Sequence, residues 1–174
     1  KVEESKCTLP PHTVTPTNIA CHGDNTGSIT ITPVGGIAPF QYSIDNGNNW
    51  QSSSIFTGLG ADVYNTKEKD INECSSQVID VTLTEPAALD CNITLTHITC
   101  FDEHDGKIEL LGTGGVPPYY YSIDNGSSYQ INGLFENLDA VTYQIKVKDA
   151  NNCIIDYTRT LFEPDEVTNL SFKI

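Results

Sequence analysis

The chain has 174 residues, and its 23 acidic side chains against 9 basic ones give a formal net charge of −14. Such a charge repels nucleic acids and anionic membrane surfaces, so neither is expected as a partner. The sequence contains no run of 18 apolar residues and no signal-peptide pattern at Lys1, so we expect no direct membrane insertion and a mature or excised segment.

The chain repeats itself. A shift of 79 residues lays Cys21–Cys74 onto Cys100–Cys153 without a gap, and 22 of the 54 aligned positions are identical. Self-similarity at a fixed period is typical of an array of modules, each with its own small core.

In the first copy, alternating apolar and polar residues predict strands over residues 27–34 and 40–45. Asn46-Gly47 follows directly. Both residues tolerate positive φ, so this dipeptide predicts a tight hairpin turn. A shorter strand pair is expected around residues 50–51 and 55–56.

The second half of the copy resembles the end of an immunoglobulin-like sandwich. Tyr64 follows Leu59 by five residues, which is the spacing of the corner where a Tyr hydroxyl ties down the turn before the penultimate strand. Residues 78–83 form the last predicted strand. No stretch of ten or more residues has a helical apolar period, so we predict an all-β chain of two tandem immunoglobulin-like (fibronectin III or PKD type) β-sandwich modules, each with an internal disulfide.

Glu85-Pro86 closes the first copy and Glu163-Pro164 the second, because Pro cannot continue a central strand. The predicted modules are therefore residues 1–86 and 87–164, with residues 87–92 as a short linker running into the next strand. Residues 165–174 are expected to be a tail or the start of a following repeat, since Val167–Ile174 alternates like an opening strand.

The penultimate strand differs between the copies. The second copy has Ile145 and Val147 where the first has Thr66 and Glu68. A buried carboxylate costs several kcal/mol unless it is paired. Either this strand is loose or bulged, Glu68 has a partner, or the sequence is unreliable here.

Four cysteines recur at equivalent places and are 53 residues apart in each copy, which predicts the disulfides Cys21–Cys74 and Cys100–Cys153. Each would contribute roughly 4 kcal/mol by restricting the unfolded chain. Free thiols or a zinc site are the competing interpretations, but no CxxC is present. Cys7 and Cys91 either bond each other or pair with neighbouring modules.

The pattern Gly-Gly-x-x-Pro-[Phe/Tyr]-x-Tyr-Ser-Ile-Asp-Asn-Gly is followed by Phe-x-x-Leu, Tyr-x-x-Lys-x-Lys-Asp-x-Asn-x-Cys and Glu-Pro. Together these motifs resemble the SprB repeat over Asn18–Pro86 and Ile98–Pro164. That family occurs in very large surface adhesins of gliding and related Bacteroidetes.

The resemblance implies export through the bacterial envelope by a type IX route, an extracellular cell-surface location, and a role in adhesion or gliding motility. It supplies no catalytic residues. The expected partners are neighbouring repeats, surface glycans or other cell-surface proteins.

No cofactor is expected, although acidic turns near both ends of the repeat raise the possibility of weak structural calcium. If the Cys21–Cys74 bridge draws Asp24 and Asp70 together, their oxygens form a site of extracellular-grade affinity. The corresponding set in the second copy is Asp102, Asp105 and Asp149. The alternative is that these acids, and the hairpin-tip acids Asp45 and Asp124, are solvated turn residues.

Exposed aromatic side chains suggest a carbohydrate-binding platform, which is the alternative function. Trp50 and Tyr120 are the candidates, whereas Tyr119 and Tyr121 are expected to face the core. The copy-one counterpart of Tyr120 is Gln41, so a platform built on it belongs to one copy only.

An enzyme is not expected. The four histidines (His12, His22, His97 and His104) are not repeated between the copies, and no nucleophile–base pair can be identified from spacing. The sequence therefore favours a non-catalytic repeat that extends and spaces the adhesive parts of a larger protein.

Overall fold

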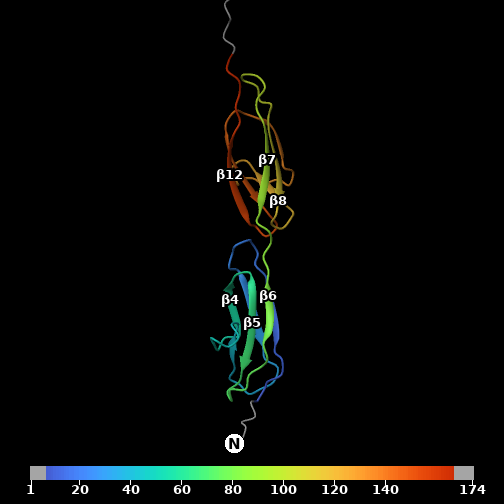
Figure 1. The fold of residues 1–174 in the computed structure, drawn as a ribbon. Coiled ribbons are helices and arrows are strands. Elements are labelled where there is room, and N and C mark those ends of the chain that lie inside the picture. The colour runs from blue at the N-terminus through green and yellow to red at the C-terminus, as the bar shows by residue number, and fades with distance from the viewer. Residues whose placement is uncertain (1–6, 167–174) are drawn as a thin grey trace, which may run out of the picture. The chain divides into compact units, whose positions relative to one another are not determined.

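The computed structural model describes residues 7–166, and the chain divides into two compact units, Lys1–Pro86 and Ala87–Ile174. We call them module 1 and module 2 and describe each by itself (Figure 1). The opening strand expected over Val167–Ile174 lies outside the described residues. Residues 7–166 form strands and turns without a helix, so no helix there is long and apolar enough to cross a membrane.

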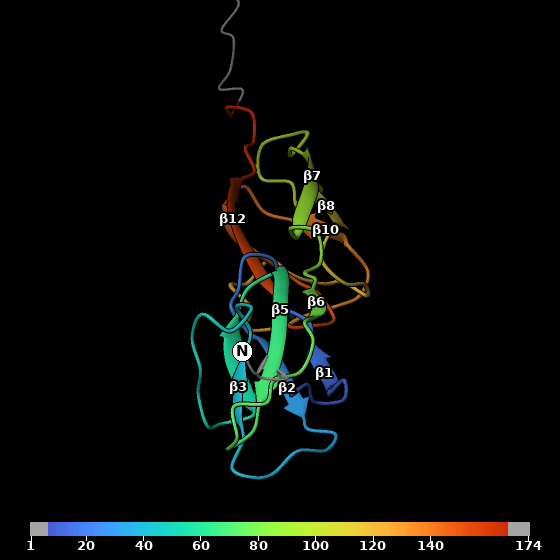
Figure 2. The same cartoon turned by 60° about the horizontal axis from the view of Figure 1, so that its bottom comes forward.

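Module 1 consists of two three-stranded antiparallel sheets, one in the order β1-β2-β4 and the other in the order β3-β5-β6. Figure 2 shows β1 beside β2 and β3 beside β5. The strands are β1 Thr13–Thr17, β2 Gly27–Thr32, β3 Gln41–Ser43, β4 Ile55–Leu59, β5 Asp62–Lys69 and β6 Ile79–Leu83.

Module 2 repeats this topology with sheets β7-β8-β10 and β9-β11-β12. Its strands are β7 Asp90–Thr96, β8 Gly106–Thr113, β9 Tyr120–Ser122, β10 Leu134–Leu138, β11 Thr142–Lys148 and β12 Ile154–Thr160. The register repeats as well, because Gly27 pairs with Leu59 and Gly106 pairs with Leu138 across an irregularity in each sheet. A Cβ at either glycine would lie 2.7 Å from the carbonyl oxygen of its Leu partner, so the sheet needs glycine there.

In immunoglobulin-like order the six strands of each module are A, B, C, E, F and G, grouped as an ABE sheet and a CFG sheet. The apolar faces of the two sheets meet in one core per module. Ile29 and Ile31 of β2 are buried against Val81 and Leu83 of β6 in module 1. Burying each such side chain contributes about 1.5–3 kcal/mol. The predicted all-β class is confirmed, and the two compact units are consistent with two tandem sandwich modules.

Two local predictions are also confirmed. Asn46 and Gly47 have φ values of 62° and 87°, and the Asn48 N–H donates to the Asp45 carbonyl, as a type I′ hairpin turn requires. The Tyr64 hydroxyl donates to the Gly60 carbonyl at 3.1 Å. In module 2 the Tyr143 hydroxyl donates to the Asp139 carbonyl at 3.2 Å. Each Tyr therefore ties down the corner before β5 or β11.

Some element bounds differ from those expected from sequence. Residues 50–51 form a single bridge to Tyr42 rather than a strand, because the chain turns away at the Ser52–Ser54 segment before β4 begins. Strand β7 begins at Asp90, inside the segment expected to be a linker.

The predicted disulfide pairing is wrong. Cys74 is bonded to Cys7, with a Cα–Cα distance of 5.0 Å, whereas Cys91 and Cys100 are free thiols. The pairs Cys21–Cys74, Cys100–Cys153 and Cys7–Cys91 therefore do not form, and module 2 has no internal disulfide among its described residues.

The physical reason is that the repeated cysteines lie at opposite ends of the sandwich. The loop that holds Cys21 is closed at the Gly27 end by a hydrogen bond from the Ala20 N–H to Thr26 Oγ1 at 3.2 Å. Cys74 follows the far end of β5, whose eight residues span about 23 Å. A disulfide requires Cα atoms within about 7 Å, so equal sequence spacing in the two copies did not reflect proximity.

Candidate functional site

The Ser-Ile-Asp-Asn-Gly motif, present in both copies, builds a closed hydrogen-bond network at the tip of the hairpin. The Ser43 hydroxyl accepts the Gly47 N–H at 2.8 Å and donates to Asp45 Oδ1 at 2.7 Å. The same carboxylate accepts the Asn49 N–H at 2.9 Å and the Asn49 side-chain amide at 2.6 Å. These bonds, chiefly the one from the Asn49 N–H, lower the pKa of Asp45 to about 2.

Module 2 has the same network with a Ser in place of the Asn. Asp124 accepts hydrogen bonds from the hydroxyls of Ser122 and Ser128, each at 2.6 Å, and from the Ser128 N–H at 3.0 Å. The Ser122 hydroxyl is the main cause of the lowered pKa of Asp124. Both hairpin-tip carboxylates therefore hold the turn, and their oxygens already have donors within the module.

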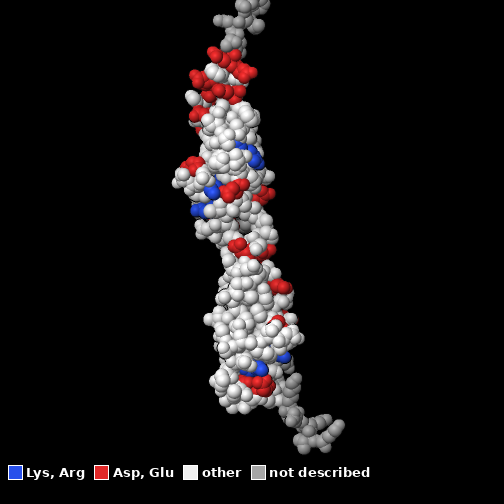
Figure 3. Space-filling view, turned by 90° about the vertical axis from the view of Figure 1, so that its left-hand side faces the viewer, with Lys and Arg blue, Asp and Glu red and all other residues white. Residues whose placement is uncertain are grey.

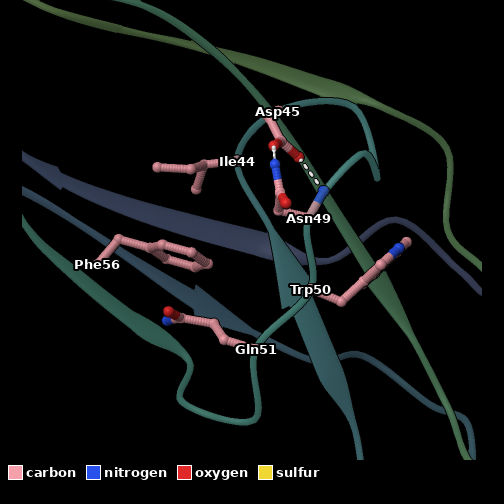
Figure 4. Close-up of a pocket in the computed structure, with 6 residues that line it drawn as sticks. All are labelled: Ile44, Asp45, Asn49, Trp50, Gln51 and Phe56. Atoms are coloured by element: carbon pink, nitrogen blue, oxygen red, sulfur yellow. Dashed lines mark hydrogen bonds between the residues drawn. The ribbon is translucent and has the colours of Figure 1, made fainter.

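A shallow hollow of about 290 Å³ lies beside this hairpin in module 1, lined by Ile44, Asp45, Asn49, Trp50, Gln51 and Phe56. Figure 4 shows the Trp50 side chain pointing away from Phe56 and Gln51, on the other side of the backbone. The polar groups at the rim of the hollow, Asp45 and Asn49, are engaged in the turn network. The hollow is therefore a poor ligand site by itself, and the exposed chemistry lies on the side to which Trp50 points.

On that side Trp50 lies against lysines of β5. The Lys69 ammonium is 5.0 Å from the centre of the Trp50 ring. In module 2 the Lys148 ammonium is 4.7 Å from the ring of Tyr129, the counterpart of Trp50, and 5.5 Å from the ring of Tyr120. Cation–π contacts of this kind contribute about 0.5–1 kcal/mol at exposed sites. The two predicted platform residues, Trp50 and Tyr120, are thus both paired with lysines.

The neighbouring tyrosines lie as expected from strand alternation. Tyr121 is buried, and its hydroxyl accepts the Gly112 N–H at 2.9 Å. Tyr119 packs against the core of module 2 and donates to the Gly114 carbonyl at 2.6 Å. Only Tyr120 of the three lies on the lysine-bearing face.

The convergence of acids predicted for calcium does not occur. Asp70 follows β5, about 23 Å from the end of the module that holds Asp24, and it is nearly buried. One of its oxygens accepts the N–H groups of Asn72 and Cys74, and the other accepts that of Ile37 at 3.2 Å. Asp70 therefore ties the β5–β6 turn to the Gly-Gly loop.

Asp149 does the same in module 2. It accepts the N–H groups of Asn151, Cys153 and Val116, each at 2.9 Å. Within residues 7–166 no three His, Cys, Asp or Glu side chains are arranged to hold a metal ion.

Asp102 and Asp105 lie at the other end of module 2, near a hollow of about 420 Å³. Asp105 accepts the hydroxyl of Thr99 at 2.5 Å, which lowers its pKa. His104 is paired with Asp139, and this hydrogen bond raises the pKa of the imidazole. Asp105 therefore stabilises its loop and Asp139 holds His104. Figure 3 shows acidic atoms gathered at its top, at one end of module 2.

Sequence reasoning missed a buried polar cluster in module 1, formed by His12, Thr66, Glu68 and Ser76. His12 Nε2 is 2.8 Å from the Thr66 hydroxyl, and its Nδ1 is 3.1 Å from the Ser76 hydroxyl. The Thr66 hydroxyl donates to the Ile79 carbonyl, so His12 carries its proton on Nε2 and accepts from Ser76 at Nδ1. Burial lowers the pKa of His12, in agreement with this neutral form.

Glu68 lies in this cluster with a side chain that is 0% exposed, and neither carboxyl oxygen has a hydrogen-bond partner. Burial raises its pKa. The strand is regular at this position, because Glu68 pairs with Tyr42 in register. The expectation of a bulged strand is therefore wrong. No partner of full hydrogen-bond geometry reaches the carboxyl group, although the backbone N–H of Val34 acts on it and opposes part of the rise in pKa that burial causes.

The 79-residue shift was the signal that could have revealed the cluster. It aligns His12, Thr66, Glu68 and Ser76 with Cys91, Ile145, Val147 and Ile155, which belong to or pack against the apolar core of module 2. His12 and Ser76 resemble a base and a nucleophile, but both are buried.

The comparisons with known proteins agree with the repeat seen in sequence and fold. The sequence model of the SprB repeat family matches residues 13–49 and 92–133, one segment in each module. No protein of curated function matches the chain.

Two solved structures are similar at low identity. The fibronectin(III)-like modules of Clostridium thermocellum CbhA are 14% identical over 87% of this chain and 94% of that chain, with a TM-score of 0.37. A chain from the crystal structure of a mouse coronavirus receptor-binding domain complexed with its murine receptor is 12% identical over 87% of this chain and 100% of that chain, with a TM-score of 0.38. At these TM-scores neither likeness adds to the strand topology described above. The family matches do add to it, because one segment of each module is similar to the SprB repeat.

Proposed function

We propose that this chain is a non-catalytic repeat segment of a large secreted adhesin or filament, which extends the protein from a bacterial cell surface and spaces its adhesive parts. Type IX export and a role in adhesion or gliding motility belong to the same proposal. Its basis is the SprB repeat in each of two tandem sandwich modules.

The observation that carries the proposal is what the two copies share. Three pairs of side chains repeated between them, Asp45 with Asp124, Asp70 with Asp149 and Tyr64 with Tyr143, hold backbone turns of their own module. A repeat kept for chemistry would share reactive groups placed in a pocket. A repeat kept for spacing needs only a stable module, and that is what the shared residues build.

A segment exchange in the cells that make the protein tests this proposal. Residues 7–166 are replaced by two unrelated fibronectin III modules of similar length, and in a second strain they are deleted. A spacer predicts that attachment to a surface survives the exchange but weakens on deletion. Loss of attachment in both strains, with the protein still displayed, would show that these modules carry a specific contact.

Carbohydrate binding is the second candidate, favoured by the aromatic rings that face lysines on the outer side of each CFG sheet. A glycan array with the Tyr120→Ala variant as a control tests it. Saturable binding that depends on Tyr120 supports this candidate, and a blank array removes it.

A further inference from the structure

Basic side chains are scarce in this chain, and those described are not scattered. Residues 7–166 contain six of them, namely Lys67, Lys69, Lys107, Lys146, Lys148 and Arg159. Four of the six occupy the outer face of β5 or β11 beside an aromatic ring. The face drawn in Figure 3 likewise shows basic atoms only in small groups, with wide areas that carry no charge.

In each module the ring lies between two lysines. A Cβ built on Gly47 would meet the Trp50 ring at 3.0 Å and Lys67 Cδ at 3.7 Å, so both side chains pack over that glycine. Lys69 approaches the same ring from β5 at 5.0 Å. We call the set of Lys67, Trp50 and Lys69 the lysine–aromatic strip of module 1.

The strip of module 2 consists of Lys146, Tyr129 and Lys148, and Tyr120 extends it. Lys146 Cδ and the Tyr129 hydroxyl would both lie 3.0 Å from a Cβ on Gly126. The Lys148 ammonium lies near both tyrosine rings, at 4.7 Å from Tyr129 and 5.5 Å from Tyr120. The same arrangement thus occurs twice, with Trp in one copy and Tyr in the other.

One lysine of each strip is already neutralised. Lys69 pairs with Glu73 at 2.8 Å, and Lys146 pairs with Asp156 at 2.7 Å. Lys67 and Lys148 have no carboxylate within ion-pair distance among residues 7–166, although the chain has more than twice as many acids as bases. Each strip therefore has one lysine without a carboxylate partner, although the two are not at equivalent positions: Lys148 lies over the Tyr129 ring, whereas Lys67 packs with Trp50 over Gly47.

We propose that the lysine–aromatic strips bind an anionic polysaccharide, with a sugar ring on Trp50 or Tyr129 and its acidic group on Lys67 or Lys148. The flat ring provides apolar contact for the face of a pyranose, and an ammonium–carboxylate hydrogen bond is stronger than a neutral one. The net charge of −14 repels any polyanion at long range, so binding of an acidic polysaccharide depends on the local ammonium groups and on the contact of a sugar with the aromatic ring. The proposal rests on the second candidate function and leaves the spacing role independent.

The test uses the purified two-module protein and polygalacturonate, with fully methyl-esterified polygalacturonate as the matched neutral probe. Trp50 is the only tryptophan, so its fluorescence reports binding to the strip of module 1, and calorimetry reports binding to both strips. We expect saturable binding to polygalacturonate that weakens with added salt, and binding at least fivefold weaker to the ester.

The variants Lys67→Gln and Lys148→Gln, alone and combined, remove the uncompensated charges. The matched control is Lys107→Gln, because Lys107 is an exposed lysine of the other sheet, paired with Glu136. The double variant is expected to lose about fivefold or more in affinity while Lys107→Gln changes it less than twofold. Far-UV spectra confirm that each variant is folded.

Absence of saturable binding to polygalacturonate, or an equal loss in the Lys107→Gln control, overturns the proposal. Equal binding of the acid and its methyl ester overturns the acidic class but leaves carbohydrate binding standing. The exchange of the whole segment in cells addresses the spacing role separately, so the two failures are distinguishable.

Discussion

Replacing Glu68 by Val should stabilise module 1. The structure gives Glu68 no exposed surface and no hydrogen-bond partner for either carboxyl oxygen, and the equivalent residue of module 2 is the buried Val147. Leaving a buried polar group unsatisfied costs about 1–3 kcal/mol, and exchanging buried charged groups for apolar ones often stabilises by about 1–4 kcal/mol. The smaller Val leaves some empty space, which offsets part of the gain. We expect a net increase of about 2 kcal/mol at pH 7, or about 10 °C in Tm for a module of this size.

The pH dependence identifies the cause. Burial raises the pKa of Glu68 above its ordinary value of 4.5, so the folded module binds this proton more tightly than the unfolded chain does. The resulting stabilisation is fully present below pH 4.5 and is lost as the pH rises through the folded-state pKa. The advantage of Glu68→Val should therefore grow from pH 4.5 to pH 7. Burial lowers the pKa of His12, so its protonation destabilises the folded module at acid pH. Both proteins contain His12, so this contribution largely cancels in the difference between their stabilities.

Fluorescence of Trp50 during urea unfolding measures module 1 alone, because module 2 has no tryptophan. Val147→Glu is the matched control and should destabilise module 2 by several kcal/mol, followed by far-UV circular dichroism. A Glu68→Val protein that is less stable than the parent at pH 7, or a difference that does not vary between pH 4.5 and 7, would refute this reasoning.

The geometry of the modules supports three further predictions. Tyr143→Phe removes the hydroxyl that bonds to Asp139, so module 2 should lose about 1 kcal/mol and roughly 4–8 °C in Tm; an unchanged Tm would show that this corner contributes nothing to stability. Cys7→Ser opens a disulfide that spans 67 residues and should lower the stability of module 1 by about 4 kcal/mol, seen as an earlier Trp50 transition, whereas an unchanged urea midpoint would argue against the Cys7–Cys74 bond in solution. Melting with 5 mM calcium and with a chelator should give the same midpoints, since the turn carboxylates already accept backbone N–H groups, and a rise with calcium would mean that these oxygens are available to a cation.

Features set by neighbouring residues in the sequence were predictable. The Asn-Gly turn, the Tyr corner and the alternation of β2 depend on local backbone and side-chain rules, and the 79-residue repeat located them twice. The Ser43–Asp45 network was not foreseen in detail, although it forms within seven residues, because several donors compete for one carboxylate.

Features that depend on which end of the sandwich a loop occupies were not predictable from spacing. Cys21 and Cys74 both have counterparts in the second copy, but in the fold they are separated by the length of β5. The same separation keeps Asp24 and Asp70 apart. The polar cluster around Glu68 was visible only as a departure from the apolar pattern, because its members come from three separate segments of the chain.

We proposed that these SprB-like modules stand outside the cell, and Cys100 allows a direct measurement. Cys100 is a free, exposed thiol, whereas the other free thiol, Cys91, is buried. A membrane-impermeant maleimide is applied to intact cells that make the protein, with Cys100→Ser as the control strain, and labelling of the protein is read after purification. We expect labelling of intact cells that is absent in the Cys100→Ser strain. Labelling that appears only after the cells are lysed would contradict it.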